Sequence, residues 1–118
     1  MFPAVRAGGA TTVRTAGNMA GYADLELRKA IDEGRVVGPK MDVTAPYLEG
    51  RGLPILQVHA LSGPADARQT VAYWADRGAT SFKAYMHLTR AELGAAVAEA
   101  HRRGIKVTGH LCSVRLIV

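Results

Sequence analysis

Short runs of β-branched and apolar residues alternate along the chain with longer segments whose apolar residues recur every three or four positions. The short runs predict four strands, at residues 11–14, 40–44, 80–85 and 105–110. The longer segments have the spacing of amphipathic helices and occupy residues 23–33, 64–77 and 90–103. The chain therefore has the pattern β-α-β-α-β-α-β.

Helix boundaries are marked by residues that favour starts and stops. Thr89 and Glu92 have the spacing of a capping box, in which a hydroxyl and a carboxylate each bond a free backbone N–H. Pro64 suits the first turn of a helix, and glycines follow the three predicted helices at Gly34, Gly78 and Gly104.

Alternating strands and helices with short connections predict an α/β fold with a parallel sheet, either doubly wound or part of a barrel. No glycine-rich phosphate loop follows any strand, and Arg14, Lys83 and His110 lie at the C-terminal ends of predicted strands, where barrel enzymes gather their chemistry. We therefore predict a partial (β/α)8 TIM barrel of about four βα units. Since a closed barrel takes about 250 residues, residues 1–118 are expected to be a single fragment of such a domain.

The stretch from Ala45 to Gly63 is rich in proline and glycine and predicts a long irregular loop. Loops of this length inside compact domains are usually functional, so this one is a candidate pocket wall.

Composition narrows the function classes. The chain is 48% hydrophobic and carries 15 basic and 10 acidic residues, but its longest basic run is Arg102–Arg103, without stacking aromatics between clustered cations. Nucleic acid is therefore not an expected partner.

No run of 18 apolar residues and no signal-like start is present, so no membrane partner is expected either. The single thiol, Cys112, favours a reducing compartment and hence the cytoplasm.

Lys83 and His110 are the main candidates for chemistry. Lys83 lies within a strand predicted to be buried, where an amine needs a partner or a modification. His110 ends the next strand, 27 residues later (110 − 83), so the two side chains are expected to share one site. An activated lysine forms a Schiff base with a carbonyl or a carbamate with carbon dioxide, and the carbamate ligates metals together with imidazole.

The other histidines are less informative. His59 and His87 are expected at the solvent-facing rim, and His101 lies in the last turn of a helix, where a cation complements the helix dipole. Asp42 is a candidate acid, with a cap or an ion pair as the structural alternative. Cys112 follows His110 by two positions, which is weak evidence for a metal site or a nucleophile.

Four segments in a fixed order carry a family resemblance: residues 11–18, 27–39, 82–85 and 98–110. They resemble the amidohydrolase superfamily, in its imidazolonepropionase-like and prolidase-like branch, over about residues 2–114. The matching part is the region from strand 2 to strand 5 of that barrel.

The resemblance implies a metal-dependent hydrolase in which one or two divalent cations, often zinc, activate water against a carbon–nitrogen bond of an amide, cyclic amide or dipeptide. It maps the strand-4 lysine, typically carbamylated, onto Lys83 and the strand-5 histidine onto His110. The family's His-x-His pair on strand 1, its strand-6 histidine and its strand-8 aspartate have no counterpart in the sequence.

With two ligands instead of the three of a catalytic zinc site, the chain alone is expected to be inactive. Arg14, Asn18, Tyr47 and Tyr85 are candidate binding residues for a small-molecule substrate. Two alternatives stay open: a Schiff-base lyase using Lys83, and a non-catalytic remnant or interaction module. Exposed sheet edges of a half barrel also predict self-association.

Overall fold

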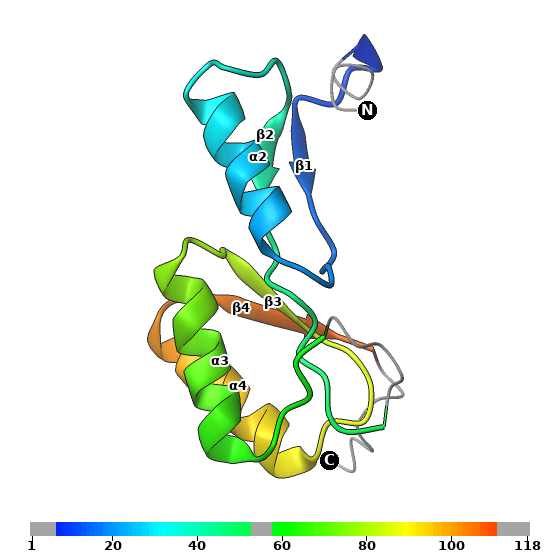
Figure 1. Ribbon diagram of the computed structural model, residues 1–118, viewed down its shortest axis with the longest axis vertical. Helices are drawn as coiled ribbons and strands as arrows, with labels where there is room; N and C mark the ends of the chain where they lie inside the picture. The colour runs from blue at the N-terminus through cyan, green and yellow to red at the C-terminus, as the bar shows by residue number, and fades with distance from the viewer. Residues whose placement is uncertain (1–6, 53–57, 111–118) are drawn as a thin grey trace.

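A computed structural model describes residues 7–52 and 58–110, and these contain four strands and three helices in strict alternation (Figure 1). Cys112 lies outside the described residues. The strands are β1 (Thr12–Arg14), β2 (Lys40–Asp42), β3 (Ser81–Ala84) and β4 (Lys106–Gly109). The helices are α2 (Tyr22–Asp32), α3 (Pro64–Asp76) and α4 (Arg90–Arg102).

All strand pairing is parallel and follows chain order. β1 pairs with β2 and β3 pairs with β4, with Thr12 opposite Lys40 and Lys83 opposite Thr108. Isolated parallel bridges between Thr44 and Ser81 and between Leu48 and Ala84 join the two pairs. The result is the predicted α/β architecture of four βα units.

The segment directly after β2 differs from the sequence prediction of an irregular loop over 45–63. Its backbone bonds both neighbours: Tyr47 N donates to Asn18 O at 3.0 Å, and Leu48 N donates to Lys83 O at 2.9 Å. The sequence did not predict this strand-like stretch, because Pro46 and Gly50 are residues that usually interrupt strands. The later part of the stretch, at Leu61 and Ser62, does line a cavity, as a pocket wall was predicted to do.

The core lies between β3–β4 and the helices α3 and α4, which lie side by side in Figure 1. Ala67 and Val71 of α3 and Ala96 and Ala100 of α4 are fully buried against Phe82. Small residues at these positions let the two helices pack closely on the strands. The predicted apolar stripes of both helices are therefore confirmed.

Helix starts and stops also agree with the sequence. The Thr89 hydroxyl accepts from Glu92 N at 3.1 Å, while the Glu92 carboxylate accepts from Thr89 N at 2.9 Å, so both halves of the capping box are formed. Within the described residues, no helix has the length and apolar character needed to cross a membrane.

Candidate active site

The face of the sheet turned away from the helices gathers polar side chains. Phe82 and Ala84 are buried in the helix-side core, so the alternate residue Lys83 points to the opposite face. Lys83 is half-buried there and stands in register with Thr108 of β4. We call this face the open face of the sheet.

Arg14 reaches this face from the far end of the strand order. Its Nη2 donates to Thr108 Oγ1 at 3.2 Å, joining β1 to β4 across 94 positions of sequence. Thr108 Oγ1 in turn donates to the Phe82 carbonyl at 3.3 Å. Since the first and last strands of the order contact through one side chain, the sheet is strongly curved around the open face.

Aromatic rings line the C-terminal end of the same face. Tyr85 directly follows β3, and its ring lies 4.7 Å from Tyr47 and 4.7 Å from His110, measured between centroids. The His110 ring meets the Tyr85 ring edge-on, with an angle of 76° between the ring planes. The backbone N–H of His110 donates to the Ala84 carbonyl at 3.2 Å. Tyr47, Tyr85 and His110 therefore form one contiguous group.

Asn18 contributes to the architecture at this end. Its amide nitrogen donates to Asp24 Oδ2 at 2.8 Å and lies 3.4 Å from the Thr44 carbonyl, and its oxygen accepts from Gly21 N. The side chain thus ties the β1–α2 loop to the start of α2. Gly17 is required next to it, because a Cβ there would lie 2.6 Å from the Tyr47 ring.

All six predicted site residues lie around the C-terminal ends of the strands. Arg14 donates to Thr108, which is the register partner of Lys83 in the sheet. The rings of Tyr47, Tyr85 and His110 touch, and the Asn18 carbonyl accepts from the backbone N–H of Tyr47. Thr108 was not predicted; its place two residues before His110 on the same strand face was the available signal.

The donor groups of the described residues do not complete a metal site. Within residues 7–52 and 58–110, no three His, Cys, Asp or Glu side chains lie close enough together to hold a metal ion. Lys83 and His110 therefore offer at most two of the ligands that a catalytic metal requires.

The remaining sequence candidates have local partners. Asp42 accepts a hydrogen bond from the Thr80 hydroxyl, which is neither the cap nor the ion pair considered from the sequence. His59 is exposed, as predicted, and lies 2.8 Å from Asp66 Oδ2. Burial raises the pKa of Asp66, but hydrogen bonds from the Ser62 N–H, His59 and the Ser62 hydroxyl outweigh it, so the pKa is lowered overall.

One buried acid escaped the sequence analysis. Glu49 is 2% exposed, and its carboxylate accepts from Gly50 N at 2.9 Å and from Met86 N at 3.3 Å. His87, the non-glycine residue with positive φ (54°) among those described, places Nδ1 3.5 Å from the same carboxylate. Nothing in the spacing of this glycine-rich stretch distinguishes Glu49 from a surface loop acid.

Comparison with known proteins adds to this geometry. No family model and no curated protein matches the sequence. Among solved structures, bottromycin amidohydrolase matches with a TM-score of 0.80 and 27% identity over 92% of this chain. A protein from Bifidobacterium longum described as a prolidase matches with a TM-score of 0.67 and 31% identity over 86% of this chain. The fold is part of the amidohydrolase barrel.

The match to the amidohydrolase barrel is partial in length. The chain covers 24% of the bottromycin amidohydrolase chain and 28% of the Bifidobacterium longum protein. A Xaa-Pro dipeptidase with methionine bound in its active site shares the fold at 22% identity, with 32% of its chain covered and a TM-score of 0.69. About a quarter to a third of each of these proteins thus corresponds to this amidohydrolase-like chain, which confirms the predicted partial barrel.

Proposed function

We propose that this chain is part of a metal-dependent hydrolase of carbon–nitrogen bonds, and that Lys83 and His110 supply two groups of its active site. The observation that carries the proposal is positional. Lys83 and His110 lie on the same face of the sheet, at the C-terminal ends of two neighbouring parallel strands. The fold that contains these strands matches amidohydrolases. Active sites of (β/α)8 barrels lie at this end.

The substrate class is a small molecule with an amide, cyclic amide or dipeptide bond. Support comes from the names of the matched proteins, which include an amidohydrolase and a Xaa-Pro dipeptidase. Tyr47 and Tyr85 offer an aromatic surface next to His110, and Arg14 offers a cation on the open face. The side chains of Arg14, Tyr47 and Tyr85 would contact the substrate rather than the metal ion.

The 118-residue chain by itself is proposed to be inactive, because the part of it that the structure describes offers two ligands rather than the three protein ligands of a catalytic site. Purified chain supplied with Zn²⁺ and bicarbonate is expected not to hydrolyse amide or dipeptide substrates. Turnover that disappears in Lys83→Met would contradict this part of the proposal.

Metal binding tests the residue assignment without relying on activity. Calorimetric titration of Zn²⁺ is expected to give weak binding that loses at least about tenfold in affinity in His110→Ala, since each metal ligand contributes directly. His101→Ala is the matched control, because His101 is exposed in the last turn of α4, before β4 begins, and so is away from the C-terminal ends of the strands. Equal Zn²⁺ affinity in the wild type and His110→Ala would reject His110 as a ligand.

A Schiff-base lyase is the second candidate, and the position of the half-buried residue Lys83 on a strand of the open face favours it. Borohydride reduction with a carbonyl substrate would trap a covalent adduct on Lys83 in that case. Under the hydrolase proposal no adduct forms, and mass spectrometry instead detects a carbamate whose level follows the carbon dioxide concentration.

A further inference from the structure

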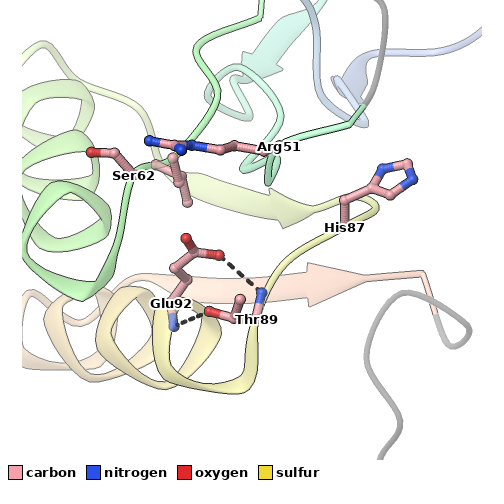
Figure 2. A pocket seen from close by; sticks show the side chains of 6 residues that line it. Arg51, Ser62, His87, Thr89 and Glu92 are labelled. Carbon is pink, nitrogen blue, oxygen red and sulfur yellow. Dashed lines mark hydrogen bonds between the residues drawn. The ribbon is translucent and has the colours of Figure 1, made fainter.

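The cavity lined by Leu61 and Ser62 lies on the helix side of the sheet and contains none of the six candidate site residues. It has a volume of about 340 Å³ and is lined by Arg51, Leu61, Ser62, His87, Thr89 and Glu92. This volume is at the small end of the range for ligand pockets. Its walls come from the segment after β2, the segment before α3 and the start of α4 (Figure 2).

Two opposite charges face each other across this cavity. Figure 2 shows the Glu92 carboxylate pointing into the space beneath the extended side chain of Arg51. Among the described residues no ion pair joins the two side chains. Glu92 is 6% exposed, and one carboxylate oxygen already accepts from Thr89 N.

The fixed position of Glu92 makes the arrangement specific. The capping box holds its carboxylate on one side of the cavity, whereas Arg51 is exposed and extends over the other. Ser62 adds a hydroxyl, and buried Leu61 adds an apolar wall. A ligand complementary to these walls carries an anionic group, a cationic group and a small apolar side chain.

We propose that this cavity binds a small zwitterion of amino-acid size, with its carboxylate on Arg51 and its ammonium on Glu92. Each charged group of the ligand then gains a charge-assisted hydrogen bond in a partly desolvated site. The proposal is independent of the function assigned to Lys83 and His110, because those residues belong to the opposite face of the sheet.

Three ligands of similar shape test the charge requirement: L-leucine, its amide, which keeps only the ammonium, and 4-methylpentanoate, which keeps only the carboxylate. NMR titration of the chelator-treated full chain is expected to show L-leucine shifting the amide signals of Ser62 and Thr89. The two singly charged analogues are expected to bind at least about tenfold more weakly, since each of them loses one charge-assisted hydrogen bond. Equal affinity for all three ligands, or no binding of L-leucine at about 10 mM, which is roughly tenfold above a millimolar Kd, would overturn the proposal.

Variants separate this site from the open face. Arg51→Gln is expected to lose at least about tenfold in affinity, and Glu92→Gln to lose preference for L-leucine over 4-methylpentanoate while keeping an acceptor for Thr89 N. Arg68→Gln, on the exposed surface of α3 and outside the cavity, is the matched control and is expected to bind like the wild type. Lys83→Met is also expected to bind normally. Unchanged affinity in Arg51→Gln, or loss in Lys83→Met, would contradict the assignment.

Discussion

Gly50 lies in the segment after β2 and packs directly against the β3–α4 connection. It is buried, and its N–H lies 2.9 Å from the Glu49 carboxylate and 3.2 Å from the Met86 carbonyl. A Cβ at this position would overlap the carbonyl oxygen of His87. The sequence shows only one of several loop glycines here, but the packing leaves no room for any side chain.

Gly50→Ala is accordingly expected to destabilise the protein by about 3 kcal/mol or more, because backbone rather than a flexible side chain must move. Gly94→Ala is the matched substitution. Gly94 lies within α4 with nothing within 4 Å of an added Cβ, so alanine is expected to stabilise by about 0.5–1 kcal/mol. Urea unfolding of both variants measures the two free energies of unfolding. A Gly50→Ala variant as stable as the wild type would contradict the close approach.

Among single residues, the sequence identified those on regular strands and missed those whose surroundings come from distant segments. Lys83 and His110 follow from strand period and helix repeat length, and the structure places Lys83 in register with Thr108 and the ring of His110 against Tyr85. That the two side chains share one site stays a prediction. Glu49 is buried because the Met86 N–H and His87 fold over it from 37 residues away or more. The local sequence pattern around Glu49 does not predict contacts with residues so far away in the chain.

At the level of elements, α3 and α4 are tied together at their C-terminal ends by charge. Arg103 contacts Asp76 of α3 at 2.6 Å and Glu99 of α4 at 2.7 Å, while Arg102 contacts Glu99 at 2.6 Å. Hydrogen bonds from Arg102 and Arg103 lower the pKa of Glu99 to about 2. Ordinary helix spacing predicts the contacts within α4, but not the one to Asp76.

This depressed pKa sets the sign of a pH dependence. The contribution of Glu99 is complete above its ordinary pKa of 4.5 and is lost as the pH falls toward about 2. The stability difference between the wild type and Glu99→Gln is therefore expected to shrink across that window and to diminish in salt, because Arg102 is largely exposed. Urea unfolding at several pH values measures it.

Glu26→Gln is the control for the Glu99 measurement, since Glu26 is an exposed acid on α2. Its effect on stability is expected to stay nearly constant over the same window. A Glu99→Gln difference that grows on acidification would show that the ion pairs do not stabilise the folded state.

Across the whole molecule, the parallel strand order has two outer edges among the described residues: β1 pairs only with β2, and β4 only with β3. Unpaired edges present free N–H and C=O groups that pair readily with another chain. The fold covers about a quarter to a third of the matched proteins, so these edges are where further barrel strands attach in a complete barrel.

We expect the 118-residue chain to self-associate in proportion to its concentration, as measured by size-exclusion chromatography with light scattering. Thr12→Glu adds a charge at the exposed β1 edge, opposite Lys40, and is expected to reduce association while keeping the β1–β2 pair. A compact monomer at all concentrations would contradict open-edge pairing.

The sequence by itself determined the order of strands and helices, the capping box at Thr89 and the parallel α/β class, because hydrophobic period and turn residues are local properties. It also placed Lys83 and His110 on neighbouring strand ends. Only the tertiary structure decided that Arg14 meets Thr108, that Glu49 is buried and that Arg51 faces Glu92 across a cavity. Sheet curvature and loop packing bring these groups together, and both depend on contacts between segments far apart in the chain.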